Sequence, residues 1–204
     1  MMSKVIVFGA SSGVATGLIR ELTKHGITSV PVSRSGAGGA QRVDALDAAA
    51  VEALFAAHRD ATALVSLIGG KPFQKEKLTP PDLVGNRHLI EACERHGIRR
   101  FVLVSTIGAG DSRTAAPWLA RLVLGKFMAL KTEAEALLRE STLEWTIVRP
   151  GHLKNGAATG NGMLLEDSTV SGAIAREDVG ALVADLLGRP ETIGKIYACI
   201  EPRK

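Results

Sequence analysis

The sequence predicts an α/β fold, a single Rossmann-type domain in which helices flank a doubly wound parallel sheet. The 204 residues suffice for one compact domain and are few for two. Short, continuously apolar runs recur along the chain, and uninterrupted apolarity is typical of strands that are buried on both faces of a parallel sheet. Helical patterns separate these runs, and such alternation forms right-handed βαβ crossovers.

Each predicted strand is a short apolar run bounded by Gly, Pro, Ser or charged residues. The runs cover residues 4–8, 29–32, 63–68, 101–105, 146–148 and 196–200. The predicted helices cover residues 14–25, 47–58, 83–96, 119–140 and 177–187. Helix-ending glycines follow several of these segments, and Asp47 is a suitable N-cap. The Gly-rich segments 36–39 and 155–171 are predicted as loops, and the second has the composition of a mobile lid.

The composition excludes several classes of protein. The 25 Lys and Arg residues against 21 Asp and Glu leave a net charge of +4 that is spread along the chain, so we expect no nucleic-acid surface. A leader sequence and an apolar stretch of about 18 residues are both missing, so we expect a cytoplasmic protein without a membrane partner. Cys93 and Cys199 have neither disulfide nor metal-ligand spacing, which favours a reducing compartment and no metal site.

A glycine-rich turn directly follows the first predicted strand. Its residues are Gly9, Ala10, Ser11, Ser12, Gly13, Val14 and Ala15. We expect Gly9 to form the tight turn, Gly13 to let the backbone approach a pyrophosphate, and Ala15 to allow close packing of helix on strand. The N-terminus of the following helix offers N–H groups and a positive dipole end to phosphate. The sequence therefore predicts a dinucleotide site here, with a loop that binds no ligand as the alternative.

The end of the second predicted strand carries Ser33, Arg34 and Ser35 where an NAD site would place an acidic residue. The planar cation of Arg34 suits a phosphate dianion, and the two hydroxyls add hydrogen bonds. This pattern predicts NADP(H) as the cofactor, with a solvated surface arginine as the alternative. Asp44, at the end of the next expected strand, either binds the adenine amino group or caps the following helix.

With these motifs, the sequence resembles the short-chain dehydrogenase superfamily, in its atypical NAD(P)-binding branch of NmrA-like and biliverdin/flavin reductase-like proteins. The resemblance spans nearly the whole chain. Besides the glycine turn and Arg34 it rests on Leu67-Ile68-Gly69-Gly70, on FVLVST at 101–106, on Lys131-x-Glu-x-Glu, on TIVRPG at 146–151, and on Arg176-Glu-Asp-Val.

This resemblance implies roles for the later motifs. It implies that residues 67–70 line the ribose and pyrophosphate and that Ser105 and Thr106 lie beside the nicotinamide. It also implies that Pro150, Gly151, His152 and Leu153 close over the nicotinamide. Residues of about 151–175 would then form a small substrate-side region within a domain that covers residues 1–204.

One position departs from the reductases of the superfamily, which commonly place a proton-donating Tyr four residues before the Lys. Lys131 is present, but the residue four positions earlier is Phe127, and the chain's single tyrosine is Tyr197. Ser105 remains as a hydrogen-bond donor, and Lys131 can bind the ribose, although a surface pair with Glu135 is the alternative. A simple carbonyl would need the missing acid, whereas a flavin or quinone spreads the incoming charge and takes its proton from water.

Three further side chains are candidates on the acceptor side. His152 is a possible acid, with a surface-loop histidine as the alternative. Trp118 could stack on a planar acceptor beside Leu153, with core packing as the more common fate of a lone Trp.

The basic cluster of Arg95, Arg99 and Arg100 is expected to be a solvated face.

The preferred hypothesis is an NADP(H)-dependent oxidoreductase that passes hydride to a small planar acceptor of the flavin or quinone type. The alternative is a non-catalytic NADP(H)-binding sensor or assembly module, which the absence of the phenol favours. An epimerase or dehydratase fits poorly, because only about fifty residues follow Arg149. We expect a monomer or a homodimer.

Overall fold

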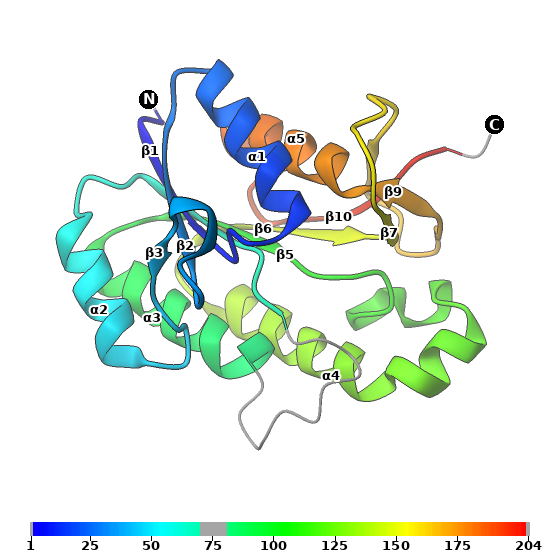
Figure 1. Ribbon diagram of the computed structural model, residues 1–204. Coiled ribbons are helices and arrows are strands. Elements are labelled where there is room, and N and C mark those ends of the chain that lie inside the picture. The colour runs from blue at the N-terminus through cyan, green and yellow to red at the C-terminus, as the bar shows by residue number, and fades with distance from the viewer. Residues whose placement is uncertain (1, 70–80, 203–204) are drawn as a thin grey trace.

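The computed structural model describes residues 2–69 and 81–202 and has the predicted α/β architecture (Figure 1). Its strands are β1 (Lys4–Phe8), β2 (Thr28–Ser33), β3 (Gln41–Arg42), β4 (Ala63–Ser66), β5 (Arg100–Val104), β6 (Glu144–Pro150), β7 (His152–Lys154), β8 (Met163–Leu165), β9 (Ala173–Ala175) and β10 (Lys195–Ile200). Its α-helices are α1 (Gly13–Lys24), α2 (Ala48–Ala57), α3 (Asn86–His96), α4 (Trp118–Glu140) and α5 (Arg176–Leu187). Shorter helical segments are η1 (Ala37–Gly39), η2 (Pro81–Gly85), η3 (Gly110–Ala115) and η4 (Pro190–Thr192).

Eight of the described strands form one sheet in the order β3-β2-β1-β4-β5-β6-β10-β8. All neighbours are parallel except β8, which pairs antiparallel with β10. The direction of winding reverses between β1 and β4, and in open α/β sheets this switch point is where a ligand binds. Helices α1 and α3 follow β1 and β4 in the chain, so each begins near the carboxyl ends of these strands, beside the crevice.

The edge strand β8 corrects the prediction that residues 155–171 form a lid without regular structure. Residues Met163–Leu165 extend the sheet, with Ala198 opposite Leu165 and Ile200 opposite Met163. Apolar side chains explain the pairing, because Leu164 and Leu165 each pack against a buried cluster. Much of the remaining segment on both sides of β8 is exposed.

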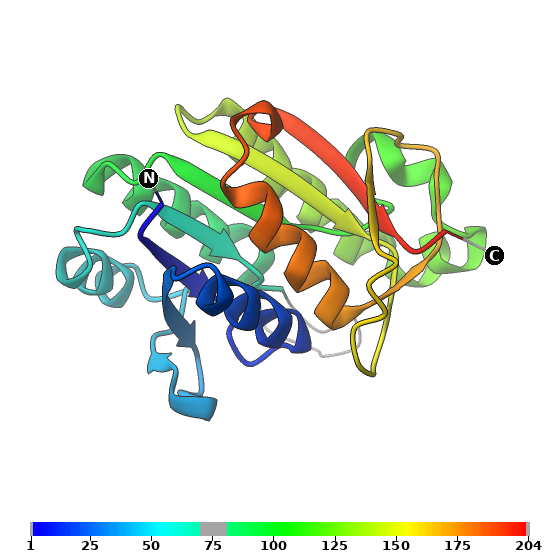
Figure 2. The ribbon, with the colours of Figure 1, turned by 90° about the horizontal axis from the view of Figure 1, so that it is seen from above.

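Two helical layers cover the sheet. Helices α1 and α5 lie on one face and helices α2, α3 and α4 on the other (Figure 1), and α1 and α5 run side by side when seen from above (Figure 2). Gly17 and Gly180 let α1 and α5 approach so closely, because a Cβ atom on Gly17 would lie 2.3 Å from the Glu177 carbonyl oxygen. Ala15 is fully buried in the same layer. The sequence analysis expected close packing of this helix on the strand at Ala15 and did not predict the close approach of α1 to α5 at Gly17 and Gly180.

The prediction that Arg95, Arg99 and Arg100 form a solvated face is wrong for Arg100. Arg95 and Arg99 are exposed and pair with glutamates, but Arg100 is buried. Its guanidinium donates to the carbonyl oxygens of residues 144, 186 and 187 and to the hydroxyls of Thr146 and Thr192, at 2.8–3.3 Å. Burial lowers the pKa of Arg100 to about 10. This arginine therefore ties α5 and η4 to the sheet at the end opposite the crevice.

Within residues 2–69 and 81–202, no helix combines the length and the apolar character that crossing a bilayer requires.

Candidate functional site

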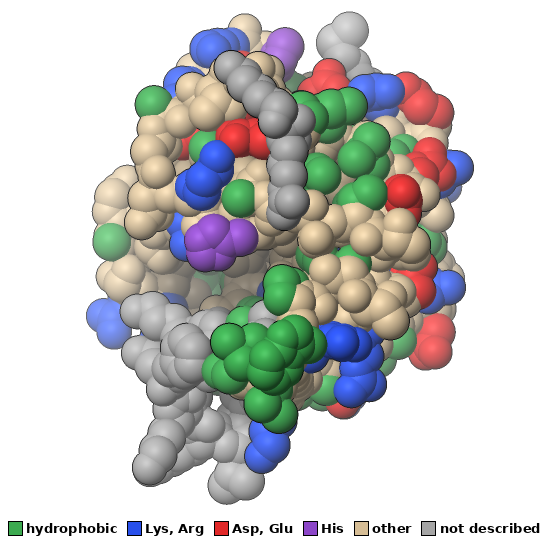
Figure 3. Space-filling model, turned by 90° about the vertical axis from the view of Figure 1, so that its right-hand side faces the viewer, with side chains coloured by type: hydrophobic (Ala, Val, Ile, Leu, Met, Phe, Trp, Pro, Cys, Tyr) green, Lys and Arg blue, Asp and Glu red, His purple; other side chains and the backbone are tan. Residues whose placement is uncertain are grey.

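The crevice at the carboxyl ends of the strands opens into a cavity of about 770 Å³. The ends of β5 and β6, the start of α4, the β7–β9 ribbon and the start of α5 all contribute to its walls. Figure 3 views this side of the molecule and shows that the surface is hollowed there. A cavity of this size holds a small organic acceptor or one end of a cofactor.

The glycine turn after β1 has the geometry that a nucleotide site requires. Gly9 adopts a φ of +85°, and a Cβ there would lie 2.8 Å from the carbonyl carbon of Leu67. The N–H groups of Gly9 and Ala10 both donate to the Val32 carbonyl oxygen at 3.0 Å. Ser12 caps α1, because its Oγ accepts the N–H of Ala15 at 3.2 Å. Strands β2 and β4 thus hold the turn from both sides, and Ser11 remains exposed.

Arg176 lies beside this turn. The sequence analysis named it within the Arg176-Glu-Asp-Val motif but predicted no role for it in the site. A Cβ on Gly13 would lie 3.0 Å from the Arg176 Cδ, so the arginine side chain covers the first residue of α1. Its Nε donates to the Asn155 Oδ1 at 3.0 Å, and the residue also lines the cavity. A cation that spans the glycine turn and the cavity suits a pyrophosphate. Its place as the first residue of α5 is the signal that could have identified it.

The residues after β2 lie at the edge of the crevice. Ser33 is buried, and its Oγ accepts the N–H of Gly36 at 3.0 Å. Arg34 and Ser35 follow and are exposed. The helix-capping alternative for Asp44 is wrong, because Asp47 caps α2, while Asp44 accepts the N–H of Leu46 at 3.0 Å within a turn.

Lys131 is buried, with 4% of its surface exposed, and its ammonium group forms an ion pair with Asp82 at 2.9 Å. It also donates to the Ile68 carbonyl oxygen at 2.9 Å. The ring of Phe127 lies 5.9 Å from the same ammonium nitrogen. The surface-pair alternative with Glu135 is therefore wrong. Lys131 lies beneath Gly69, where a Cβ would come within 3.0 Å of its nitrogen.

A buried polar network continues from this pair and was not foreseen. Asn86, fully buried at the start of α3, donates to the Asp82 carbonyl oxygen at 2.6 Å. Its Oδ1 accepts the hydroxyl of Ser66, the last residue of β4, at 2.6 Å. Polar residues inside otherwise apolar predicted elements are the signal that could have found it. Gly70, which belongs to the same motif as Ile68, lies outside the described residues.

Ser105 follows β5 and is 8% exposed. Its Oγ is buried and has no hydrogen-bond partner within the described part of the chain. Its neighbour Thr106 lines the cavity. Buried hydroxyls are nearly always satisfied, so this one, next to a cavity-lining residue, is a candidate hydrogen-bond donor to a ligand.

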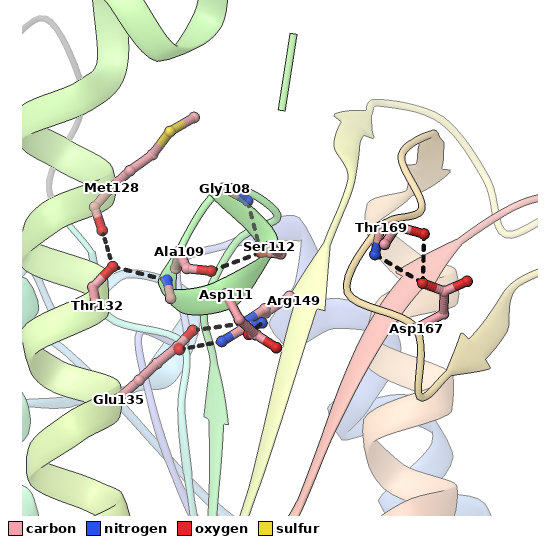
Figure 4. A network of polar contacts seen from close by, with 11 residues as sticks. Gly108, Ala109, Asp111, Ser112, Met128, Thr132, Glu135, Arg149, Asp167 and Thr169 are labelled. Carbon is pink, nitrogen blue, oxygen red and sulfur yellow. Dashed lines mark hydrogen bonds and ion pairs between the residues drawn. The ribbon is translucent and has the colours of Figure 1, made fainter. Parts of the chain in front are cut away.

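The segment after β5 is fastened by Arg149 of β6 (Figure 4). The Arg149 guanidinium forms a bidentate pair with the buried Glu135 carboxylate at 2.7 and 3.0 Å and also binds Asp111 of η3. Burial lowers the pKa of Arg149, but the hydrogen bonds and charges of both carboxylates outweigh burial and raise it. The hydrogen bond from Arg149 lowers the pKa of the Asp111 carboxyl. In addition, the Gly110 N–H donates to the Thr132 hydroxyl at 2.9 Å.

The acceptor-side candidates fall into two groups. The cavity is lined by Pro150, Gly151, His152 and Leu153, and His152 is exposed at its rim. Trp118 does not belong to the residues that line the cavity, and 68% of its surface is exposed. Core packing of this side chain is therefore wrong. Within the described residues, no three His, Cys, Asp or Glu side chains are placed to hold a metal ion.

Known proteins share this architecture. A family model described as NAD(P)H-binding matches residues 9–190. The Saccharomyces cerevisiae protein YMR090W is 30% identical over an alignment that covers 94% of this chain and 90% of that protein. Sanguinarine reductase from Eschscholzia californica is 28% identical over 57% of this chain and 43% of that protein. The chain thus spans less than half the length of two plant relatives. The solved structure of the anaerobilin reductase ChuY from Escherichia coli superposes with a TM-score of 0.83 at 30% identity, covering 99% and 98% of the two chains.

Proposed function

The chain belongs to the NAD(P)H-binding family, and from that premise we propose that it is an NADPH-dependent reductase that transfers hydride to a small planar acceptor of the flavin or quinone type. The observation that carries the proposal is the buried hydroxyl of Ser105, which precedes the cavity-lining Thr106 and has no hydrogen-bond partner among the described residues. A module that only held the adenosine half of a nucleotide would not need a hydrogen-bond donor there. Two similar proteins, ChuY and sanguinarine reductase, are reductases by name.

The described residues fit a dinucleotide. The glycine turn and the N-terminus of α1 would hold the pyrophosphate, with Arg176 across it. Arg34, Ser33 and Ser35 would bind the 2′-phosphate that distinguishes NADP from NAD. The remaining contacts would come from residues that surround the crevice, namely Asp44, Leu67, Ile68, Gly69, Thr106, Lys131, Pro150, Gly151 and His152.

The bound dinucleotide supplies the hydride, and the chain supplies position and hydrogen bonds. The Ser105 hydroxyl donates to the acceptor atom on which negative charge develops. Lys131 would bind a ribose hydroxyl, with its ammonium group fixed in place by Asp82 and by the Ile68 carbonyl oxygen. No phenol occupies the position of Phe127, so the final proton comes from water or from His152 at the rim. A conjugated acceptor tolerates this arrangement because its charge is delocalised.

A non-catalytic NADP(H) sensor is the second candidate. The observation that favours it is Phe127, which packs near the ammonium group of Lys131 where the superfamily's reductases place their acid. Such a sensor binds NADPH with the same preference but does not oxidise it in the presence of any acceptor. Cofactor binding therefore tests what both candidates share, and hydride transfer separates them.

Cofactor choice is tested by fluorescence titration of NADPH and NADH. We expect NADPH to bind more tightly, and Arg34→Ala to weaken NADPH binding by tenfold to a hundredfold, since a hydrogen bond to a charged group contributes about 1.5–3 kcal/mol. NADH binding should change little. Arg139→Ala removes the same charge from the exposed end of α4 and serves as the matched control. Equal affinities for the two nucleotides in the unmodified protein would contradict the assignment.

A further inference from the structure

The N-terminal half of α4 exposes a stripe of large apolar side chains. Trp118, Leu119, Leu122 and Val123 are 68%, 55%, 75% and 56% exposed. Their spacing places them on one side of the helix, opposite Leu124 and Met128, which line the cavity. Figure 3 shows hydrophobic side chains gathered beside the hollow. Single exposed apolar residues are common, but a contiguous group marks a surface that contacts something apolar.

Basic side chains accompany this stripe, and acidic ones are missing from it in the sequence. Residues 112–132 contain no Asp or Glu. Arg113, Arg121 and Lys126 are exposed within that segment. Arg113 and Arg121 also line a shared depression of about 320 Å³ together with Thr132 and the first acidic residue, Glu133. The stripe therefore combines an apolar surface with a cationic pocket large enough for a phosphate group.

We propose that the α4 stripe, defined as Trp118, Leu119, Leu122 and Val123 with the flanking Arg113, Arg121 and Lys126, docks on an anionic lipid bilayer. A helix with Trp and Leu on one side and basic residues around them lies in the interfacial plane and pairs with lipid phosphates. Docking of this kind does not require a helix that spans the bilayer.

Charge argues against a second copy of the chain as the occupant. A two-fold interface brings the same patch of both subunits together, so the basic side chains of one stripe would face those of the other. Anionic headgroups neutralise the same charges. The docking surface is independent of the proposed function, although it would place the cavity mouth, through Ala116 and Pro117, next to the bilayer.

The test is flotation with vesicles of phosphatidylcholine alone and of phosphatidylcholine with phosphatidylglycerol at a ratio of about three to one. We expect binding to the anionic vesicles, a blue shift of tryptophan emission, and weaker binding at high salt. The double variant Leu122→Ser/Val123→Ser should lose at least tenfold in affinity, and Arg121→Gln severalfold. Ile193→Ser and Arg139→Gln, which change an exposed apolar residue and an exposed cation elsewhere, should bind as the unmodified protein does.

Three outcomes would overturn the proposal. These are no binding to anionic vesicles, equal binding by the double variant and by Ile193→Ser, and a dimer in light scattering that only the double variant abolishes. The last outcome would assign the stripe to a second copy of the chain. NADPH titration of the same variants, without vesicles, keeps the docking separate from the proposed function, because those substitutions leave the nucleotide site untouched.

Discussion

The glycine turn after β1 and the segment after β5 both follow parallel strands and face the same crevice, but different interactions hold them. Backbone groups and close glycine contacts fix the turn, with two N–H groups on one Val32 carbonyl and Gly9 against Leu67. Side-chain charges fix the segment after β5, with Arg149 clamped between Glu135 and Asp111. The glycine turn, on the proposed cofactor side, therefore tolerates little change in shape, whereas the segment after β5, on the proposed acceptor side, can change with its ion pairs.

Gly17→Val tests the rigidity of the cofactor side and should have the largest effect. The new side chain would collide with the backbone of Glu177, 2.3 Å from its carbonyl oxygen, and would separate α1 from α5. We expect a loss of more than about 3 kcal/mol in the free energy of unfolding, followed by thermal circular dichroism. Thr16→Val, at the exposed neighbouring position, should leave the melting temperature nearly unchanged. A stable Gly17→Val protein would mean that the helices do not approach so closely.

Asp82→Asn tests the buried pair of Asp82 and Lys131 next to Gly69 and should rank second. It leaves the ammonium group of Lys131 buried without its counter-charge, which costs about 3 kcal/mol. Chemical denaturation measures this loss. The double variant Asp82→Asn/Lys131→Met removes both charges and should recover part of the stability, but it should still bind NADPH more weakly. If the losses measured for Asp82→Asn and for Lys131→Met alone simply added in the double variant, the two residues would not interact.

Asp111→Asn tests the acceptor side and should have the smallest effect on stability. Asp111 is exposed, so we expect a loss of less than about 1 kcal/mol, together with a change in acceptor KM as η3 loosens. Because pairing lowers the Asp111 pKa, its contribution is complete above the ordinary value of about 4 and disappears as the pH falls through the lowered value. The unfolding curves of the two proteins should therefore differ at pH 6 and converge in acid. A difference that persists in acid would contradict an ionic role.

The same contrast explains what the sequence could predict. The strand Lys4–Phe8 and the cap Asp47 depend on neighbouring residues, and both occur as predicted. The groups that hydrogen-bond to the buried Arg100 lie 44 to 92 residues away in the sequence, so no local pattern could identify them. Strand β8 has three residues within a Gly-rich segment, too few to establish a period.

The candidate site divides in the same way. The geometry of the glycine turn could be predicted because it depends on consecutive residues. The ion pairs of Lys131 and Arg149 could not, since each joins elements that the sequence keeps apart. The exposure of Trp118 likewise depends on where α4 extends relative to the sheet, as Figure 1 shows.

Stopped-flow absorbance of NADPH mixed with the protein and a flavin, a quinone or an aldehyde tests the central claim most directly. We expect single-turnover oxidation with the flavin or the quinone, little reaction with the aldehyde, and a slower reaction for Ser105→Ala at unchanged NADPH affinity. NADPH that binds but is not oxidised by any of the three acceptors would contradict the reductase and leave the sensor.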